Sequence, residues 1–359
     1  MSLVRPPLAD LHERAGARTG AFAGWDMPIQ FSGAIAEHEA VRERVGVFDV
    51  SHLGTVWVEG PGAAACVDAA FTNDPRGLDD GRSQYTLCAS PDGGVADDLI
   101  VYRLAATRWL VVPNAANTAA VVERLEHCAG ADADVLDESS AWAVLAVQGP
   151  RSFPLVVDVT GVSPDDLAFG DVVELELHGA PAVLCRTGYT GERGVELVVP
   201  DRTAASVWTA LVEAGAEPCG LAARDTLRLE MGYPLHGNEL SVDVSPLEAG
   251  AGWAVKVDDR SPVGAEALRA ARAAGVPRRL RGLVGDSRRP PRAGMDVALD
   301  GRRVGGVTSG SFSPVLGVGI GLALLERDVP DGTVVQVDVR GTAVPFTVTR
   351  PPMVDRSPH

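Results

Sequence analysis

Three strand-rich blocks, separated by helical segments, set the main limits on the fold of this sequence. In residues 55–114, short runs of alternating apolar and polar residues are interrupted by a helix that begins near Pro61. Residues 141–199 form a second block, which two helical patterns follow. Residues 279–348 are rich in glycine and valine with frequent turn signals, typical of a small barrel or sandwich. Because 359 residues also exceed the usual size of one hydrophobic core, we predict an α+β fold with several domains.

Composition excludes several classes of protein. The formal net charge of -16 argues against a general nucleic-acid binder, which needs a basic face for phosphate contacts. The longest apolar run, residues 316–325, is far shorter than the roughly 20 residues of a membrane-spanning helix. The five cysteines are scattered without a CxxC pair, and no HxxxH, HExxH or GxSxG pattern occurs. We therefore expect a cytoplasmic protein without a metal ion or acyl-transfer chemistry, which binds neither nucleic acid nor a membrane.

The first block contains a hairpin whose register can be predicted. The dipeptide Asp92-Gly93 is a strong signal for a two-residue turn, and such a turn places Leu87 opposite Asp98. Residues 105–107 are suited to a three-residue loop before the next strand. With that loop, Asn114 also comes to lie opposite Asp98.

This register gathers polar side chains on one face of the predicted sheet. Side chains alternate between the two faces of a strand, so Tyr85, Asp98, Tyr102 and Asn114 share a face, whereas Asp97 points to the other. A slip of one residue would reverse the choice between the two aspartates. Adjacent aspartates are disfavoured in an apolar strand, which indicates a role for at least one of them. An edge strand with two solvated acids explains the pattern equally well.

Two further clusters carry charged residues in regular positions. A glycine-rich loop at residues 186–193 leads into a strand in which Glu196 alternates with apolar residues. In the helical pattern at 220–230, Arg224 and Arg228 lie four positions apart and so share one face. Taken alone, these patterns are also typical of a hairpin with a solvated glutamate and of a salt-bridged helix surface.

Together these pieces resemble the T-protein family of the glycine cleavage system along nearly the whole chain. Many separate motifs occur in the family's order, which makes the resemblance specific. The matching stretches are residues 22–28, 46–54, 93–102, 114–117, 145–150, 186–192, 220–230, 246–250 and 307–314.

The resemblance implies a particular architecture. It is a three-domain ring, or cloverleaf, of antiparallel-sheet domains around a central folate channel. Residues 1–50 and 141–275 would form a discontinuous folate-binding α+β domain. Residues 51–140 would form a ferredoxin-like α+β domain that carries the catalytic aspartate, and residues 276–359 a small β-barrel or jelly-roll-like domain.

The resemblance also implies an activity, that of a tetrahydrofolate-dependent aminomethyltransferase. Such an enzyme moves the methylene carbon from the aminomethyl-dihydrolipoyl arm of a lipoylated H-protein to tetrahydrofolate, releasing ammonia and forming methylenetetrahydrofolate. By similarity the catalytic carboxylate is Asp98. The folate-binding residues would be Tyr85, Tyr102, Asn114, Tyr189, Glu196 and Arg224.

The chemistry of folate fits these residue types. A carboxylate such as Glu196 can accept both the amide N–H and the exocyclic amine of a pterin. The planar guanidinium of Arg224 matches the carboxylates of the folate tail, and tyrosines provide walls for its rings. Three positions depart from the family pattern, namely Arg193, His236 and the 315–319 loop, which lacks a basic residue.

Two other functions remain compatible with the sequence. The first is a folate-dependent demethylase of the same superfamily, although such proteins are often fused to a flavin domain for which the sequence has no motif. The second is a non-enzymatic folate-binding assembly factor for iron–sulfur proteins. That group carries a cysteine-containing motif, whereas residues 186–189 of this chain contain no cysteine.

Overall fold

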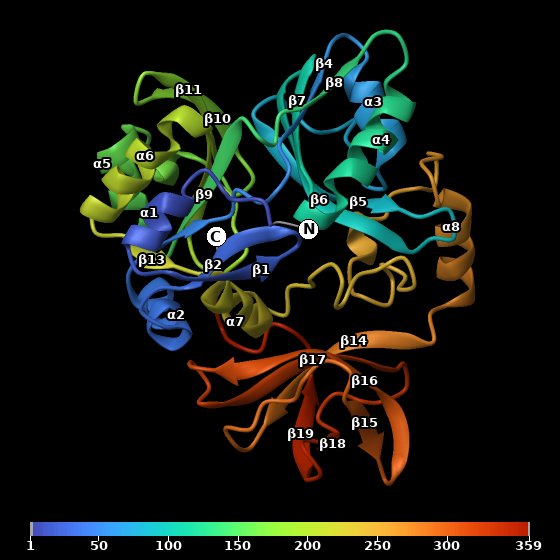
Figure 1. The fold of residues 1–359 in the computed structure, drawn as a ribbon. Coiled ribbons are helices and arrows are strands. Elements are labelled where there is room, and N and C mark those ends of the chain that lie inside the picture. Colours follow the sequence, from blue (N-terminus) through green and yellow to red (C-terminus); the bar gives the residue numbers. More distant parts are fainter. Residues whose placement is uncertain (1–2, 358–359) are drawn as a thin grey trace.

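A computed structural model describes residues 3–357 of the chain, which form three lobes that meet at a central junction (Figure 1). The first lobe contains the N-terminal segment and the middle of the chain, the second contains residues 51–140, and the third is C-terminal. Within residues 3–357, no helix is long and apolar enough to cross a membrane.

The first lobe is built on a six-stranded sheet with the order β10-β11-β12-β9-β3-β13. Its strands are β3 (Gly46–Asp49), β9 (Trp142–Gln148), β10 (Val172–Leu177), β11 (Ala180–Cys185), β12 (Gly194–Pro200) and β13 (Glu217–Cys219). The helices of this lobe are α1 (Ala9–Arg14), α2 (Ala34–Glu43), α5 (Ser152–Thr160), α6 (Asp201–Glu213) and α7 (Leu221–Met231), with a 3-10 turn, η2, at Pro164–Asp166. A hairpin of β1 (Arg18–Phe22) and β2 (Trp25–Gln30) precedes α2.

Both faces of this sheet are buried, which explains the nearly continuous apolar sequence of its central strand β12. Leu145 and Leu197 pack with the residues of α6 on one face. Ala146 and Val198 pack with the residues of α7 on the other face, in a core that also includes Tyr102 of the second lobe. The second face is therefore the one that points toward the central junction.

The second lobe is a five-stranded sheet with the order β5-β6-β7-β4-β8, in which every neighbouring pair is antiparallel. Helices α3 (Ala63–Ala70) and α4 (Thr118–Ala129) pack on one face. The strands are β4 (Val56–Glu59), β5 (Arg82–Ala89), β6 (Val95–Ala105), β7 (Arg108–Val112) and β8 (Asp134–Asp137), and a 3-10 turn, η1 (Ala115–Asn117), precedes α4.

The predicted register of the β5–β6 hairpin is confirmed, because Leu87 pairs with Asp98. Gly93 has a φ of 83°, as its place in the turn requires. The predicted three-residue loop at 105–107 is wrong, since Ala105 pairs with Arg108 and a bulge precedes that pair. The bulge absorbs the difference, so that Ile100 still pairs with Val112. The edge-strand interpretation is also wrong, because β6 lies between β5 and β7.

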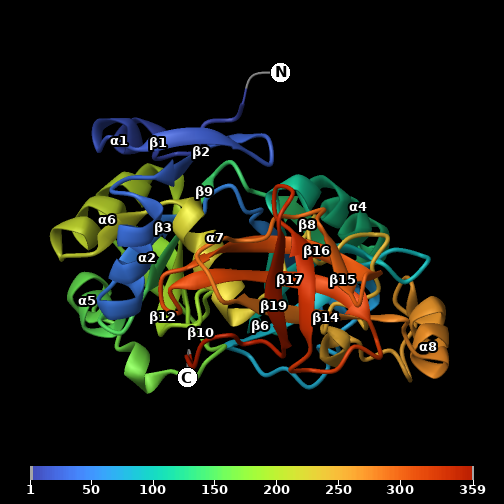
Figure 2. The same ribbon diagram turned by 90° about the horizontal axis from the view of Figure 1, so that it is seen from below.

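The third lobe is a closed barrel with the strand order β14-β17-β16-β15-β18-β19. Its strands are β14 (Arg278–Gly285), β15 (Asp296–Leu299), β16 (Arg302–Ser313), β17 (Val318–Glu326), β18 (Val334–Asp338) and β19 (Ala343–Thr349). Seen from below, the barrel lies across both other lobes, and α7 packs against β16 and β17 (Figure 2). The predicted α+β fold with a C-terminal barrel is confirmed.

Residues 232–277 connect α7 to the barrel and contain a 3-10 turn, η3 (Gly252–Ala254), and α8 (Ala265–Ala274). Their apolar side chains form a core together with Leu87 and Val95 of the second lobe and Ile320 of the barrel. This connection therefore holds the second and third lobes together at the junction.

Candidate functional site

The end of β6 that faces the junction carries Asp98, with two of its predicted neighbours in hydrogen-bonding contact. The Tyr85 hydroxyl donates to Asp98 Oδ2 at 3.0 Å. Asn114 lies just beyond the end of β7, and its Nδ2 is 3.1 Å from Asp98 Oδ1 and 2.8 Å from the Asp98 carbonyl oxygen. Burial raises the pKa of the Asp98 carboxyl, against the hydrogen bond from Tyr85. A carboxyl with a raised pKa is suited to proton transfer near neutral pH.

Tyr102 lies on the same face as Asp98 but contacts the first lobe. Its hydroxyl is 3.2 Å from Thr187 Oγ1 and 3.5 Å from Glu196 Oε2. Tyr102 is nearly completely buried, so these contacts tie β6 of the second lobe to β12 of the first.

Glu196 is buried in the central strand β12, which excludes the solvated hairpin glutamate that the sequence alone allowed. Thr187 donates from Oγ1 to Glu196 Oε2 at 2.6 Å. Among residues 3–357, no group donates a hydrogen bond to Glu196 Oε1. One oxygen of a buried carboxylate is thus left to accept hydrogen bonds from another molecule.

Tyr189 and Arg224 form the other side of the site. The guanidinium carbon of Arg224 lies 5.0 Å from the centre of the Tyr189 ring, in a cation–π contact. Arg224 Nη1 is buried and has no hydrogen-bond partner in the described part of the chain. Burial lowers the pKa of Arg224, and the charge of Glu196 opposes this effect. The Tyr189 hydroxyl donates to the Pro234 carbonyl oxygen.

Arg228, four residues along the same helix, has a structural role instead. It is paired with Glu239 Oε2 at 2.9 Å and with Asp225 Oδ1 at 2.8 Å, and it donates to Ser309 Oγ of the barrel at 2.8 Å. The two arginines that the helical pattern groups together therefore differ, because only Arg224 keeps a free donor.

The two halves of the site are close enough to influence each other. Burial raises the pKa of the Tyr189 hydroxyl, and Asp98 adds to the rise while Arg224 opposes it. The site thus combines a carboxyl of raised pKa, a buried acceptor and an unpartnered cation. Such a combination suits a ligand with a flat donor-bearing ring at one end and an acidic group at the other.

Sequence reasoning missed two residues of this region. His52 follows β3; it is buried, and its Nδ1 has no partner among the described residues. Burial and the charge of Arg224 lower the pKa of His52 to about 4, so its imidazole is neutral. Trp253 of η3 is 59% exposed and stacks on Tyr85 with ring centres 5.3 Å apart. Neither residue has a local sequence signal, because each lies far along the sequence from the site residue that it influences or contacts, Arg224 for His52 and Tyr85 for Trp253.

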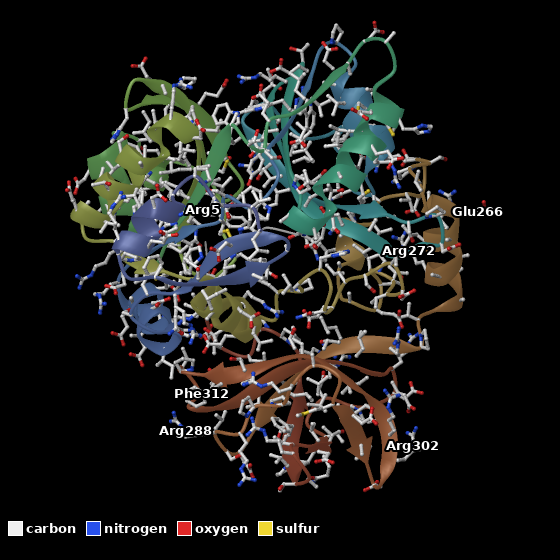
Figure 3. All side chains as sticks on the ribbon, viewed as in Figure 1. Arg5, Glu266, Arg272, Arg288, Arg302 and Phe312 are labelled. Atoms are coloured by element: carbon white, nitrogen blue, oxygen red, sulfur yellow. The ribbon has the colours of Figure 1, made fainter. Side chains whose placement is uncertain are left out.

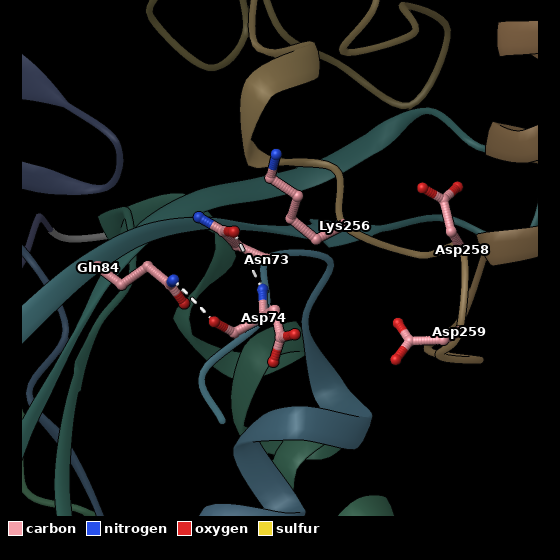
Figure 4. A pocket seen from close by; sticks show the side chains of 6 residues that line it. All are labelled: Asn73, Asp74, Gln84, Lys256, Asp258 and Asp259. Atoms are coloured by element: carbon pink, nitrogen blue, oxygen red, sulfur yellow. Dashed lines mark hydrogen bonds between the residues drawn. The ribbon is translucent and has the colours of Figure 1, made fainter. Parts of the chain in front are cut away.

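An open polar pocket of about 390 Å³ lies beside β5 (Figure 4). Gln84 donates to the Asp74 carbonyl oxygen there, and Asn73 Nδ2 donates to the Tyr85 carbonyl oxygen at 2.8 Å. Asn73, which lines the pocket, therefore holds the backbone of Tyr85, a residue of the site. Its lining residues are Asn73, Asp74, Gln84, Lys256, Asp258 and Asp259.

Comparison with known proteins identifies the family. Residues 8–259 match the GCVT N-terminal domain, and residues 278–355 match the glycine cleavage T-protein C-terminal barrel domain. The chain therefore belongs to the glycine cleavage T-protein family, a family of aminomethyltransferases. The family assignment therefore confirms the prediction of an aminomethyltransferase of the glycine cleavage system.

Individual relatives resemble the chain over its full length. It is 51% identical to an aminomethyltransferase of Parafrankia sp. (strain EAN1pec), with 99% of each chain covered. It is 48% identical to the aminomethyltransferase of Mycobacterium avium (strain 104), over 98% of this chain and 97% of the relative. The crystal structure of glycine cleavage system aminomethyltransferase T from Bartonella henselae superimposes with a TM-score of 0.93 at 35% identity, and 99% of each chain is covered.

Proposed function

We propose that the chain is a tetrahydrofolate-dependent aminomethyltransferase that acts on a lipoylated H-protein. It would take the methylene carbon from the aminomethyl-dihydrolipoyl arm, release ammonia and form methylenetetrahydrofolate. The observation that carries this proposal is the presence of a buried acceptor, Glu196, and of a cation, Arg224, whose buried Nη1 has no hydrogen-bond partner in the described part of the chain. The H-protein contact is transient, as a carrier must leave after each turnover.

The donor set of the site fits a folate. The pterin's amide N–H and exocyclic amine would donate to Glu196, whose Oε1 has no donor from the described chain. A carboxylate of the folate tail would accept from the orphaned Nη1 of Arg224. Tyr189, whose ring already lies under a guanidinium, would provide an aromatic wall.

Asp98 has the properties that the transfer requires. Ammonia leaves the aminomethyl carbon as a folate amine attacks it, so positive charge builds up at that carbon. The carboxylate of Asp98 would stabilise this charge or take up the proton that the amine loses, and its raised pKa supports proton uptake. Tyr85 and Asn114 bind one oxygen each and so fix the orientation of the carboxylate.

We also propose the domain boundaries 1–50 with 141–275, 51–140, and 276–359, arranged as a ring around a folate channel in a cytoplasmic enzyme. Pairing of β3 with β9 supports the first of these, because it joins the two sides of the 51–140 insertion within one sheet. The closed barrel that begins with β14 supports the last.

Glu196→Ala should weaken tetrahydrofolate binding by about 1 to 3 kcal/mol, or roughly 5- to 150-fold. The physical reason is that the pterin donors would be buried without an acceptor. Titration calorimetry with tetrahydrofolate measures the effect. Glu176→Ala, on the exposed side of β10, is the matched control and should bind as the parent does. Equal affinities in the two variants would remove Glu196 from the folate site.

The barrel carries a basic pocket suited to docking an acidic carrier. The β14–β15 loop and the β18–β19 turn meet at one end of the barrel and enclose about 490 Å³. Arg288 lies over Phe312 at 4.2 Å, and Figure 3 shows both at the surface of this end. Within residues 3–357, no carboxylate forms a salt bridge with the four arginines of the pocket, Arg288, Arg289, Arg292 and Arg340.

Charge reversal of Arg288, Arg289 and Arg292 to glutamate should weaken carrier docking about 10-fold at low salt and flatten its salt dependence. The reason is that the pocket is a local positive region on a chain whose overall net charge is -16, so it is the part of the surface that attracts an acidic carrier. Reversal of Arg302 and Arg303, at the opposite end of the barrel, is the control (Figure 3). Surface plasmon resonance at several salt concentrations checks the prediction, and an unchanged salt slope would contradict it.

A further inference from the structure

A chain of hydrogen bonds leads from Asp98 to a histidine outside the proposed folate site. Asn114 Nδ2 lies between the two aspartates, 3.1 Å from Asp98 Oδ1 and 2.9 Å from Asp97 Oδ1. Asp97 Oδ1 also accepts from Asn117 Nδ2 at 2.7 Å. Asn117 Nδ2 in turn is 3.0 Å from His236 Nδ1. The chain therefore passes from the active face of β6 to its back and ends at an imidazole.

The segment that carries His236 is packed closely against the start of β6. The Val95 N–H donates to the Ser241 carbonyl oxygen at 2.8 Å. A Cβ atom at Gly94 would lie 1.9 Å from the Val242 carbonyl oxygen, so only glycine allows this approach. The position of His236 relative to the two aspartates is thus fixed by backbone contacts.

These contacts determine which imidazole nitrogen carries the proton. His236 Nε2 is 3.1 Å from the Val95 carbonyl oxygen, which can only accept, so Nε2 must be protonated. The carboxylate of Asp97 requires the NH₂ group of Asn117 to face it, and the same nitrogen faces His236 Nδ1. Nδ1 must then accept and carry no proton. The hydrogen-bond chain from Asp98 to His236 is complete only while His236 is neutral.

A second proton on His236 would place an N–H opposite the NH₂ group of Asn117, where two donors face each other. Asn117 would have to turn away, and Asp97 would lose its shortest hydrogen bond. Burial raises the pKa of Asp97 to about 7, against the bonds from Asn117 and Asn114, so its charge depends on these donors. Loss of a donor would therefore change the charge that Asn114 and Asp98 face.

We propose that His236 is a positioning residue of the transfer reaction, which keeps Asn117, Asp97 and Asn114 in the arrangement that holds the Asp98 carboxylate. The proposal rests on the proposed function for its catalytic consequence only. The charged groups near His236 are Asp97 and Asp98 of β6, and the Arg228–Glu239 pair, in which Glu239 accepts from the Leu235 N–H.

Two variants separate positioning from a general loss of structure. His236→Leu breaks the chain, and we expect kcat to fall about 10- to 100-fold with little change in the KM for tetrahydrofolate, the range for groups that orient a functional side chain. His236→Gln offers an acceptor to Asn117 and a donor to Val95, so most of the activity should be retained. Its acid limb of kcat against pH should move to lower pH, because no proton can break the chain at this position. His127→Gln, on the exposed face of α4, is the matched control.

A measurement that does not depend on turnover tests the chain itself. Nitrogen-15 NMR of the imidazole rings should show the His236 signal, identified by its loss in His236→Gln, in the Nε2–H form near neutral pH. In Asn117→Ala the group that faces Nδ1 is removed, so the preference of this ring for the Nε2–H form should weaken. If both substitutions at His236 left kcat and its pH profile unchanged, or the ring carried its proton on Nδ1, the proposal would be overturned. Absence of turnover in the parent protein would overturn the proposed function. The NMR result would still show whether the hydrogen-bond chain from Asp98 to His236 exists.

Discussion

Asp98→Asn should lower turnover about 100-fold or more while changing the affinity for tetrahydrofolate little. The substitution keeps the shape of the side chain and leaves an oxygen for Tyr85, and Asn114 loses its bond to the side chain but keeps the one to the carbonyl oxygen of residue 98. What it removes is the charge, and that charge interacts mainly with the cationic centre or the proton of the transition state. Turnover is measured as the steady-state formation of methylenetetrahydrofolate, and the affinity for tetrahydrofolate is measured by titration calorimetry.

Asp97→Asn is the natural comparison, since the adjacent side chain points to the other face of β6. We expect it to affect stability, and to lower turnover less than Asp98→Asn does, within the range of about 10- to 100-fold expected for His236→Leu, because Asp97 is a link of the same hydrogen-bond chain. The pKa of Asp97 is raised to about 7, so its stabilising contribution is present below about pH 4 and is lost as the pH rises toward 7. The parent protein should therefore lose thermal stability relative to this variant between pH 4 and 7. An inactive Asp97→Asn beside a fully active Asp98→Asn would show that the roles are reversed.

The face of β6 that each of the two aspartates occupies was predictable because it depends on local rules. Asp92 and Gly93 mark a turn, and strict alternation along β6 then assigns a face to every residue up to Tyr102. The bulge before the Ala105–Arg108 pair was not predictable, because the strands compensate for a loop length that the sequence leaves open.

The parts that sequence could not supply are contacts between distant segments. Arg224 and Arg228 occupy equivalent positions on one helix face, and only the fold pairs Arg228 with Glu239 while it leaves Arg224 Nη1 free. The stacking of Trp253 on Tyr85 likewise joins η3 to β5. Such differences arise from the way the lobes close on each other, and no periodicity in the chain encodes them.

A buried ionic cluster joins the first lobe to the barrel, and removal of its arginine has the largest expected effect on stability. Arg42 of α2 is 2.8 Å from Glu230 Oε2 and 2.9 Å from Glu192 Oε1. Glu230 also accepts from Ser313 Oγ of the barrel, and His38 Nε2 lies 3.2 Å away. Burial alone would raise the pKa of Glu230, but the nearby His38 imidazole, together with the charge of Arg42, holds it below its usual range. Arg356 Nε also lies 3.6 Å from Glu192 Oε1, so Arg42 is the closer of two guanidinium groups in the cluster and the one that contacts both carboxylates.

Arg42→Met should lower the free energy of unfolding by about 3 to 5 kcal/mol, because methionine fills much of the space but leaves the buried Glu230 without its guanidinium and Glu192 with only the more distant Arg356. Urea unfolding followed by circular dichroism measures the loss. Arg302→Met removes an exposed salt bridge to Glu326, which water and salt screen, and should change the stability far less.

The same substitution should reach the folate site through the backbone. Arg42 Nη1 donates to the Thr190 carbonyl oxygen at 2.7 Å, and this bond holds the loop that carries Thr187 and Tyr189. Arg42→Met should therefore bind tetrahydrofolate more weakly than Arg302→Met does, since the loop must be ordered again on binding. Saturating tetrahydrofolate should restore part of the lost stability, because a ligand of the native state shifts the unfolding equilibrium toward it. A loss below 1 kcal/mol, with unchanged affinity, would mean that neighbouring side chains or water replace the guanidinium, and that the cluster does not connect the stability of the lobes to the site.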